Sequence, residues 1–350
     1  MTRSSQPVRI VIASYLEPHH VDRIRAVSPR LEVVYEPHLL SAPRYVADHV
    51  GETFERPAED ERRWTSLLAE AEVLFDFDRT HMEDLPERAP SLSWVQATSA
   101  GIGQLVAKHR YAERMPETVF TTASGVHAIP LAEYTLMSIL MFRRKVPQML
   151  TDQRELRWRR FASTDLTGRS LVVVGVGSIG RAVARLASSF GMRTIGVKRT
   201  VAGVDPASLH VEDLYPFNEL HAALRGAEHV VLSAPHTPET ERMIGVTELA
   251  LLASGAIVVN VARGALIDES ALVDALESGH VGGAALDVFQ GEPLSLDSPF
   301  WTIPNVLVCS HSAGTSDHEN ERITDIFCEN LRRYLAGEPL LNMLDTATMY

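Results

Sequence analysis

The stretch Leu171-Val172-Val173-Val174-Gly175-Val176-Gly177-Ser178-Ile179-Gly180 decides the fold of this chain. Four apolar residues, typical of a buried parallel strand, run directly into a G-x-G-x-x-G motif. Residues 181–190 continue with the pattern of a helix, which Gly191 closes. A strand, this glycine motif and a helix in that order are the fingerprint of a dinucleotide site. Because the flanks fit, the stretch predicts a nucleotide site rather than a plain glycine-rich turn.

Each residue of the motif has a physical task in such a site. Gly175 permits the tight turn, Gly177 lets a pyrophosphate approach the backbone, and Gly180 allows the helix to pack closely on the strand. The helix then begins with N–H groups, including those of Ser178 and Ile179, that have no partner within the helix. These groups and the positive end of the helix dipole favour phosphates.

Composition limits what the protein can be. The chain has 350 residues, which suggests two domains of ordinary size. Hydrophobic residues make up 45% and charged residues 22%, so a normal packed core is possible. The net charge of −12 argues against nonspecific binding to nucleic acids or membrane surfaces, which requires basic patches.

The two cysteines, Cys309 and Cys328, form neither a disulfide framework nor a CxxC metal pattern. We therefore expect no metal, and a reducing cytoplasm fits this usage. No apolar run is long enough to span a membrane. Residues 1–6 are polar, and the apolar piece at 8–13 contains Arg9 and is too short for a signal-peptide core.

Strands and helices are expected to alternate along the whole chain. The first part predicts strands at 9–14, 31–35, 73–77, 92–97 and 119–123, with helices at 18–27, 64–71 and 102–110. A long helix from Pro130 toward Arg144 suits a connector between domains. The second part predicts strands at 171–174, 194–197, 230–233, 257–260, 284–288 and 306–309, and a helix at 269–277. Such alternation indicates an α/β fold with two doubly wound parallel sheets.

Two further segments support specific expectations. Ser316 and Glu319 have the spacing of a capping box and should open a last helix that ends before Gly337. Residues 37–61 are polar and broken by prolines, so we expect a long loop there. This loop either shapes the substrate pocket, with Tyr45 or His49 nearest the substrate, or is a peripheral decoration.

Three strands of the second part are followed by residues that carry chemistry. Arg263 follows the strand at 257–260, Glu292 follows 284–288, and His311 follows 306–309. In open α/β sheets, ligands bind beyond the carboxyl ends of the strands. Any one of these residues alone is as easily an ordinary surface or strand-end residue. Three of them at adjacent strand ends beside a dinucleotide fingerprint favour a catalytic site.

An arginine, a glutamate and a histidine together suit the reduction of a 2-oxo acid by a nicotinamide. Arg263 would bind the substrate carboxylate and polarise its carbonyl. His311 would give a proton to the developing alkoxide. Glu292 would hold the imidazole and favour its charged form.

Several ordered motifs resemble the D-isomer-specific 2-hydroxyacid dehydrogenase family. They cover most of the chain and are weak only across 37–61. The motifs are the segments 175–180, 260–264, 286–294 and Ser310-His311-x-x-Gly314, together with 235–240 and 94–101.

The resemblance implies a fold and a site. A Rossmann dinucleotide-binding domain at 128–312 would be inserted in a flavodoxin-like substrate domain made of 1–127 and 313–350, with hinges near His127 and Ala313. Backbone amides around Ser99-Ala100-Gly101 would join Arg263 and His311 in holding the substrate, a small 2-oxo or 2-hydroxy acid. It also implies D products and a homodimer built through the nucleotide domains. The cofactor contacts implied are Gly175, Gly177, Ser178, Ile179, Gly180, Pro235, Thr240, Val261, Ala262, Arg263, His311 and Gly314, with Asp287 on the nicotinamide carboxamide.

Two residues depart from the pattern of the family. His236 stands where an apolar residue is common, and Ser310 replaces a common proline. Glu292 argues against the formate dehydrogenase branch, which carries a different residue there. The alternatives that stay open are a related enzyme with another hydride donor, such as phosphite, and a dinucleotide-sensing protein like the C-terminal-binding-protein corepressors, which keep the same three residues.

The cofactor is predicted from the end of the second strand of the nucleotide domain. An NAD site wants an acidic residue about 20 positions after the fingerprint, to accept hydrogen bonds from the ribose 2′-hydroxyl. Here the strand at 194–197 runs into Lys198-Arg199-Thr200, and no Asp or Glu occurs before Asp205. Two cations and a hydroxyl can bind a 2′-phosphate. The sequence therefore predicts NADP(H) in preference to NAD(H), with NAD(H) possible.

Overall fold

The structure is a computed structural model that describes residues 7–348. Two compact units divide it: residues up to His127 together with those from Thr315, and Ala128–Gly314. The predicted boundaries lie at 127 and 312. That the first unit binds substrate stays a prediction. The polar segment at 1–6 lies outside the described residues.

The first unit is a five-stranded parallel sheet in the order β2-β1-β3-β4-β5. This is the flavodoxin-like strand order. The strands are β1 (Val8–Ile12), β2 (Leu31–Val34), β3 (Val73–Phe75), β4 (Trp94–Gln96) and β5 (Val119–Thr121). The helices are α1 (Pro18–Arg25), α2 (Ala58–Ala69), α3 (Leu85–Arg88), α4 (Gly103–Lys108), α5 (Tyr111–Arg114) and α12 (Glu319–Ala336), with a short 3-10 turn η1 (Pro37–Leu39).

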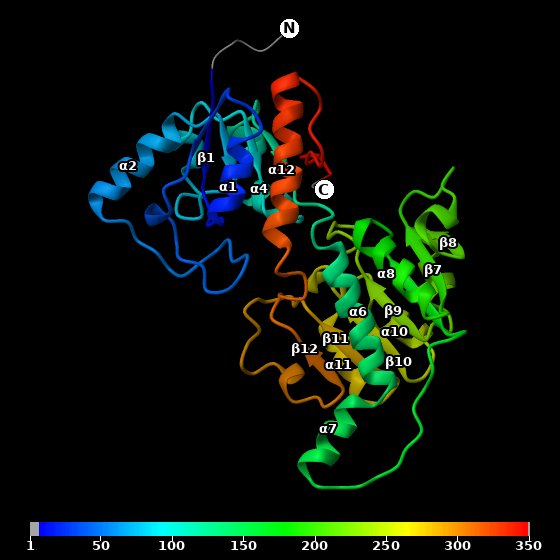
Figure 1. The fold of residues 1–350 in the computed structure, drawn as a ribbon. Coiled ribbons are helices and arrows are strands. Elements are labelled where there is room, and N and C mark those ends of the chain that lie inside the picture. The colour runs from blue at the N-terminus through cyan, green and yellow to red at the C-terminus, as the bar shows by residue number, and fades with distance from the viewer. Residues whose placement is uncertain (1–6, 349–350) are drawn as a thin grey trace. The chain divides into compact units, whose positions relative to one another are not determined.

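Both faces of this sheet are buried, because successive side chains of a strand point to opposite sides. Val73 and Phe75 of β3 pack in the core with α1 and α12, whereas Leu74 packs in the other core with α2. Figure 1 shows α12 beside α1 in this unit. Because the strands are parallel, the loops that follow them all leave from the same edge of the sheet, and the sheet is covered on both faces.

The second unit is a seven-stranded parallel sheet in the order β12-β11-β10-β9-β6-β7-β8. Its strands are β6 (Ser170–Val174), β7 (Arg193–Lys198), β8 (Asp213–Pro216), β9 (His229–Leu232), β10 (Ala256–Asn260), β11 (Val281–Leu286) and β12 (Val306–Val308). The chain winds from β6 to β8 in one direction and then continues from β9 on the other side of β6. The topological switch point, where ligands bind in such sheets, therefore lies at the end of β6.

Helices cover both faces of the second sheet (Figure 1). They are α6 (Ala128–Arg143), α7 (Val146–Arg154), α8 (Ser178–Ser189), α9 (Leu220–Leu224), α10 (Val246–Leu251) and α11 (Glu269–Glu277), with 3-10 turns η2 (Pro206–Leu209), η3 (Phe217–Glu219), η4 (Gly264–Leu266) and η5 (Pro299–Trp301). The predicted fold class, two doubly wound α/β domains, is confirmed.

Four local features differ from the sequence predictions. Strand β8 was missed, because its Asp-Leu-Tyr-Pro sequence at a sheet edge has no apolar run. Helix α7, which follows the connector helix α6, was not predicted. Helix α2 begins at Ala58, six residues before the expected start, with three acidic residues in its first turn that favour a helix N-terminus. The short helices α3 and α5 were not predicted.

The predicted capping box does not form. Helix α12 begins at Glu319, and the preceding His318 makes no side-chain cap. The Ser316 hydroxyl instead accepts a hydrogen bond from Arg322 (3.1 Å), and the Glu319 carboxylate turns to His127 (3.2 Å). The side chains of Ser316 and Glu319 therefore bind other residues and do not cap the first turn of α12. Gly337 ends the helix in the left-handed conformation, as expected.

A buried histidine ties the connector helix to the second sheet. His229 donates from Nδ1 to the carbonyl oxygen of Ser170 (2.8 Å) and accepts at Nε2 from Arg143 Nε (2.8 Å). Arg143 also donates to the carbonyl oxygens of Glu228 and Gly255. Burial, reinforced by the charge of Arg143, lowers the pKa of His229 to about 4.

This histidine predicts a pH dependence of stability. Because the folded pKa is lowered from 6.5, the unfolded chain binds the proton more tightly, so stability is full above pH 6.5 and falls as the pH decreases toward 4. The loss amounts to about 3 kcal/mol, from ~1.4 kcal/mol per pKa unit. In His229→Gln, which keeps an acceptor for Arg143, the free energy of unfolding from urea titrations should vary less over this range. His221→Gln, at an exposed histidine, is the control; equal pH dependence in His229→Gln and wild type contradicts the assignment.

Candidate active site

The loop after β10 is built to present Arg263. The Asn260 side chain closes a turn: its Nδ2 donates to the carbonyl oxygen of Arg263 (2.9 Å), and its Oδ1 accepts from the amide of Ala262 (3.1 Å). At the next residue, Gly264, a Cβ atom would stand only 1.9 Å from the carbonyl carbon of Phe289. Only glycine therefore lets the loop after β10 pack directly on the loop after β11.

Glu292 lies in the loop after β11 and joins the backbone to a histidine. Its Oε1 accepts a hydrogen bond from the amide of Phe289 (3.0 Å), and its Oε2 lies 2.7 Å from His311 Nδ1. One oxygen is thus anchored, and the other faces the imidazole. His311 Nε2 is left as the ring nitrogen available to a ligand. The structure brings together the predicted acid and base at the ends of two neighbouring strands.

Asp287 positions the loop that carries His311. Its carboxylate is buried, with 2% exposure, and Oδ1 accepts hydrogen bonds from the amides of Ser312 and Ala313 (2.9 Å each). Its carbonyl oxygen accepts from the amide of His311 (2.9 Å), a residue in the left-handed region with φ of 53°. Sequence reasoning assigned Asp287 only a contact with the nicotinamide carboxamide, which stays a prediction, and missed this anchoring role.

The electrostatics favour a protonated histidine. The hydrogen bond with Glu292 raises the pKa of His311 above its usual value, against the opposing effect of burial. Burial alone would raise the pKa of Glu292, but the bonds from His311 and the Phe289 amide lower it overall. The two groups therefore form an imidazolium–carboxylate pair over a wider pH range than isolated side chains would.

Arg263 lies within electrostatic range of both carboxylates. Burial lowers the pKa of its guanidinium, while Glu292 and Asp287 oppose that shift. An arginine stays protonated in any case. Its Nη1 donates to the carbonyl oxygen of Ala262 (2.6 Å). A fixed cation, an imidazolium and a carboxylate thus gather at the carboxyl ends of β10, β11 and β12.

The glycine fingerprint has the predicted geometry for a phosphate. Gly175 adopts a φ of 97°, and a Cβ there would stand 2.4 Å from the amide nitrogen of Ala234. A Cβ at Gly180 would stand 2.2 Å from the carbonyl oxygen of Gly175. At Gly177, in contrast, an added Cβ would have no heavy atom within 4 Å, so the space before the first turn of α8 is open. The N-terminal amides of α8, from Ser178 on, are therefore accessible to a pyrophosphate, and a dinucleotide fits these residues.

The other predicted cofactor residues occupy neighbouring loops of the same unit. Lys198 ends β7 half-buried, and Arg199 and Thr200 are exposed beyond it. Pro235 and Thr240 bound a turn after β9, in which Thr240 Oγ1 donates to the carbonyl oxygen of Pro235 (2.8 Å). The remaining contacts, Val261, Ala262 and Gly314, lie in the loops after β10 and β12.

The predicted substrate segment in the first unit follows β4. The carbonyl oxygen of Ser99 accepts from the amide of Ala123 (3.1 Å), and Ala100 and Gly101 are exposed. In the loop at 37–61, Tyr45 is 52% exposed, whereas His49 turns inward and its Nδ1 lies 3.0 Å from Ser14 Oγ. Of the two residues proposed to approach a substrate, Tyr45 is therefore the accessible one.

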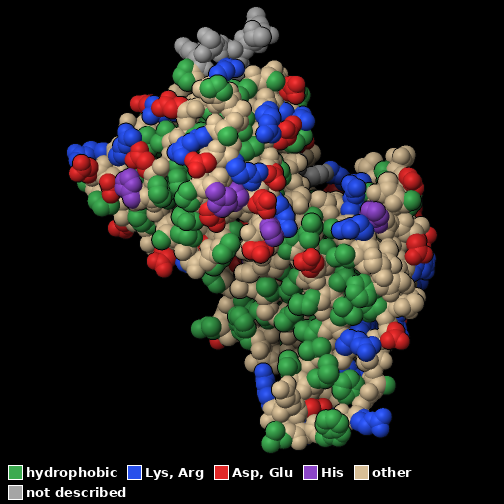
Figure 2. All heavy atoms as spheres, in the orientation of Figure 1, with side chains coloured by type: hydrophobic (Ala, Val, Ile, Leu, Met, Phe, Trp, Pro, Cys, Tyr) green, Lys and Arg blue, Asp and Glu red, His purple; other side chains and the backbone are tan. Residues whose placement is uncertain are grey.

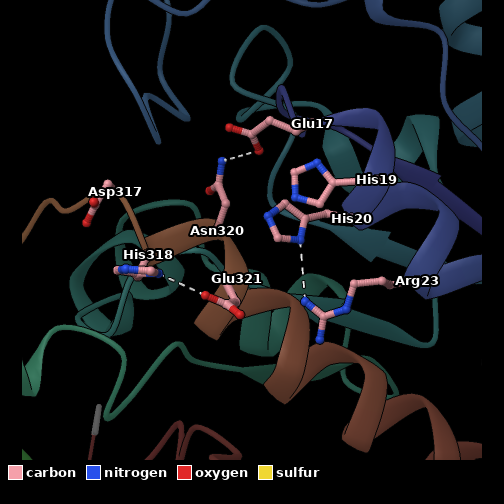
Figure 3. A pocket seen from close by; sticks show the side chains of 8 residues that line it. All are labelled: Glu17, His19, His20, Arg23, Asp317, His318, Asn320 and Glu321. Carbon is pink, nitrogen blue, oxygen red and sulfur yellow. Dashed lines mark hydrogen bonds and ion pairs between the residues drawn. The ribbon is translucent and has the colours of Figure 1, made fainter.

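A polar pocket of about 430 Å³ lies between the starts of α1 and α12, within the first unit (Figure 3). Its charged side chains largely satisfy one another: Asn320 donates to Glu17 (2.8 Å), and His318 pairs with Glu321 (2.9 Å). Among residues 7–348, no group of three or more His, Cys, Asp or Glu side chains is placed to hold a metal ion.

The second unit matches a family model. Residues 136–313, half of the chain, match the D-isomer specific 2-hydroxyacid dehydrogenase, NAD binding domain. The chain belongs to the D-isomer specific 2-hydroxyacid dehydrogenase family. The resemblance predicted from the motifs is confirmed.

The chain is also similar in sequence to individual members of this family. It is 30% identical over 303 residues to a D-3-phosphoglycerate dehydrogenase of Methanocaldococcus jannaschii, a match that covers 86% of this chain and 56% of that protein. The chain thus spans about half the length of the phosphoglycerate dehydrogenases it resembles. It is 32% identical over 266 residues to a glyoxylate reductase of Korarchaeum cryptofilum, covering 74% of this chain and 78% of that one.

A solved structure of the family superimposes on nearly the whole chain. A D-isomer specific 2-hydroxyacid dehydrogenase from Xanthobacter autotrophicus, in complex with NADPH and MES, shares 28% identity with a TM-score of 0.77, covering 99% of this chain and 100% of that chain. No helix within the described residues is both long and apolar enough to cross a membrane.

The His311–Glu292 pair makes a spectroscopic prediction. In Glu292→Gln, the pKa of His311 should fall, because the carboxylate that raises it is gone while the opposing burial remains. An NMR titration of the imidazole carbon-bound protons measures this directly. Glu269→Gln is the matched control, since Glu269 holds the same loop through the amide of Gln290 (2.7 Å) but does not pair with His311. An unchanged His311 titration in Glu292→Gln would show that the pair does not set the protonation state.

Proposed function

We propose that this protein is an NAD(P)-dependent 2-hydroxyacid dehydrogenase that interconverts a small 2-oxo acid and its D-2-hydroxy acid. The observation that carries the proposal is the His311–Glu292 pair, with Arg263 in electrostatic range, at strand ends beside an open dinucleotide fingerprint. Membership of the family and its glyoxylate-reducing and NADPH-bound relatives support it.

Each catalytic side chain has a task in the reduction. The guanidinium of Arg263 binds the substrate carboxylate and polarises the adjacent carbonyl. Protonated His311 donates its Nε2 proton to the carbonyl oxygen as that oxygen gains charge, since Nδ1 is engaged with Glu292. Glu292 stabilises the imidazolium before the transfer and fixes the ring orientation. When bound, the reduced nicotinamide supplies the hydride that adds to the carbonyl carbon.

We further propose that the cofactor is NADP(H) rather than NAD(H). Lys198 ends β7 beside the fingerprint strand, and Arg199 and Thr200 follow it, exposed to a ligand. Two cations and a hydroxyl bind a 2′-phosphate through charge-assisted hydrogen bonds. The NADPH complex of the Xanthobacter relative is consistent with this preference.

The second unit also offers a surface for a homodimer. Beyond α7, the side chains of Leu156 and Trp158 are 93% and 97% exposed, and Met149 and Leu150 on α7 are 40% and 47% exposed. Figure 2 shows hydrophobic side chains along the surface of α6 and α7. Contiguous exposed apolar surface marks interaction sites. We propose that a second copy covers them; light scattering should give a dimer for wild type and a monomer for Trp158→Asp.

The role of the loop at 37–61 and a cytoplasmic location remain proposals. Tyr45 is the exposed aromatic side chain of that loop. Replacing the loop by a short linker should change the relative kcat/KM across a panel of 2-oxo acids if it shapes the pocket. Equal relative values would make it a peripheral decoration.

The catalytic assignment predicts a specific loss of activity. His311→Ala should lower kcat by at least ~10²-fold, the scale of a lost general acid. Arg263→Ala should lower kcat and raise KM, because the guanidinium both binds and polarises. Steady-state kinetics with glyoxylate and other 2-oxo acids measure both. His318→Ala, at an exposed histidine of the first unit, should behave as wild type.

Two outcomes would contradict these proposals in different ways. A His311→Ala variant with near wild-type kcat/KM would show that the histidine is not the acid. Reduced cofactor that binds but is oxidised by no 2-oxo acid would favour the dinucleotide-sensing alternative instead.

The cofactor proposal predicts a change of preference. Arg199→Ala should raise KM for NADPH far more than for NADH, and Lys198→Asp should shift preference toward NADH, because a carboxylate repels the 2′-phosphate and accepts from the ribose hydroxyl. Kinetics with both reduced cofactors at equal salt decide this. A wild-type enzyme with higher kcat/KM for NADH would overturn the preference.

A further inference from the structure

A second side chain approaches the proposed 2′-phosphate site from the loop on the other side of the fingerprint strand. Strand β6, which carries the fingerprint, lies between β7 and β9 in the sheet. Arg199 follows β7, and Glu239 lies in the turn after β9. Arg199 Nη1 and Glu239 Oε2 are 3.9 Å apart. The pair therefore links the two loops that flank the carboxyl end of β6.

The turn that carries Glu239 is internally fixed. The Thr240 hydroxyl is buried in it, donating to the carbonyl oxygen of Pro235 (2.8 Å) and accepting from the amide of Thr237 (2.8 Å). The start of this loop is also in close contact with the fingerprint, where Gly175 leaves no room for a Cβ beside Ala234. The backbone of the turn that carries Glu239 is thus held in place next to the nucleotide turn.

The pair does little for stability. The side chains of Arg199 and Glu239 are 54% and 62% exposed, and exposed ion pairs contribute roughly 0–1 kcal/mol. The negative charge of Glu239 has a larger effect on the binding of a ligand at Arg199 than on stability. A carboxylate next to Arg199 repels a phosphate and occupies the cation that would bind it, but it can accept a hydrogen bond from a ribose hydroxyl.

We propose that Glu239 is a specificity-determining residue for the cofactor. It competes with a 2′-phosphate for Arg199, and it provides the acidic acceptor that the segment after β7 lacks. The fold thus supplies from the β9 turn the carboxylate that NAD sites usually carry at the end of the second strand. This inference rests on the proposed NADP(H) site. It makes the preference for NADPH smaller than Lys198, Arg199 and Thr200 alone would produce.

The experiment measures binding rather than turnover. Dissociation constants for NADPH and NADH are obtained by fluorescence titration of the full chain at low salt. Glu239→Gln preserves shape and removes the charge. Glu241→Gln is the matched control, because Glu241 is equally exposed, at 60%, two residues further on, and lies 3.9 Å from His236 rather than beside Arg199. Each variant is also made in the Arg199→Ala background.

Glu239→Gln should bind NADPH ~2–5-fold more tightly, the scale of one exposed charge interaction, and NADH no more tightly than wild type. Glu241→Gln should match wild type. The gain for NADPH should disappear in the Arg199→Ala background and shrink at high salt. A gain that survives without Arg199, or an equal change for both cofactors, overturns competition for the arginine.

The test separates this inference from the proposed NADP(H) preference. If Arg199→Ala weakens NADPH binding but Glu239→Gln changes neither dissociation constant, only the role of Glu239 fails. If Arg199→Ala leaves NADPH binding unchanged, the proposed 2′-phosphate site fails, and the inference about Glu239 fails with it.

Discussion

One buried residue, Asp287, ties together the ends of three strands through its backbone and its carboxylate. The amide of Asp287 donates to the carbonyl oxygen of Asn260 at the end of β10, and its own carbonyl oxygen accepts from the amide of His311 after β12. Its side chain collects the amides of Ser312 and Ala313. Hydrogen bonds to backbone amides are what allow a carboxylate to stay charged when buried. These bonds fix the backbone around His311, which is in the left-handed conformation, and the bond between His311 and Glu292 then orients the imidazole.

Close backbone contact is the second constraint, and it operates through glycine. Gly264 brings the loop that carries Arg263 against the loop that carries Glu292, and Gly175 and Gly180 press the nucleotide turn against its neighbours. These close contacts position the functional residues, because they bring side chains from different strand ends within electrostatic range of one another. The sequence contained a signal for the first contact, the glycine directly after Arg263, but its meaning depends on which loop lies opposite, and a single sequence does not show that.

Elements with a strong local pattern in the sequence were predicted, and features that depend on tertiary contacts were missed. Apolar runs predicted eleven of the twelve strands, in the same order, and the ordered motifs identified the family. Strand β8 escaped because Asp213 and Pro216 are poor strand formers whose place is decided by pairing with β7. The anchoring role of Asp287 and the approach of Glu239 to Arg199 are tertiary contacts between residues far apart in the chain. Periodicity and spacing carry no information about them.

The loop at 37–61 shows how a segment without apolar periodicity can still be ordered. Asp48, 3% exposed, accepts hydrogen bonds from the amides of Arg44, Val50 and Gly51 and from the Arg44 guanidinium. Burial would raise the pKa of Asp48, but these bonds lower it well below its usual value. Asp48 and Asp287 thus have the same role in the two units: each accepts hydrogen bonds from backbone amides of a loop, where no sheet or helix provides an acceptor. Part of the acidic excess of the chain is therefore structural, and the net charge of −12 overstates the negative charge that its surface presents to an anionic ligand.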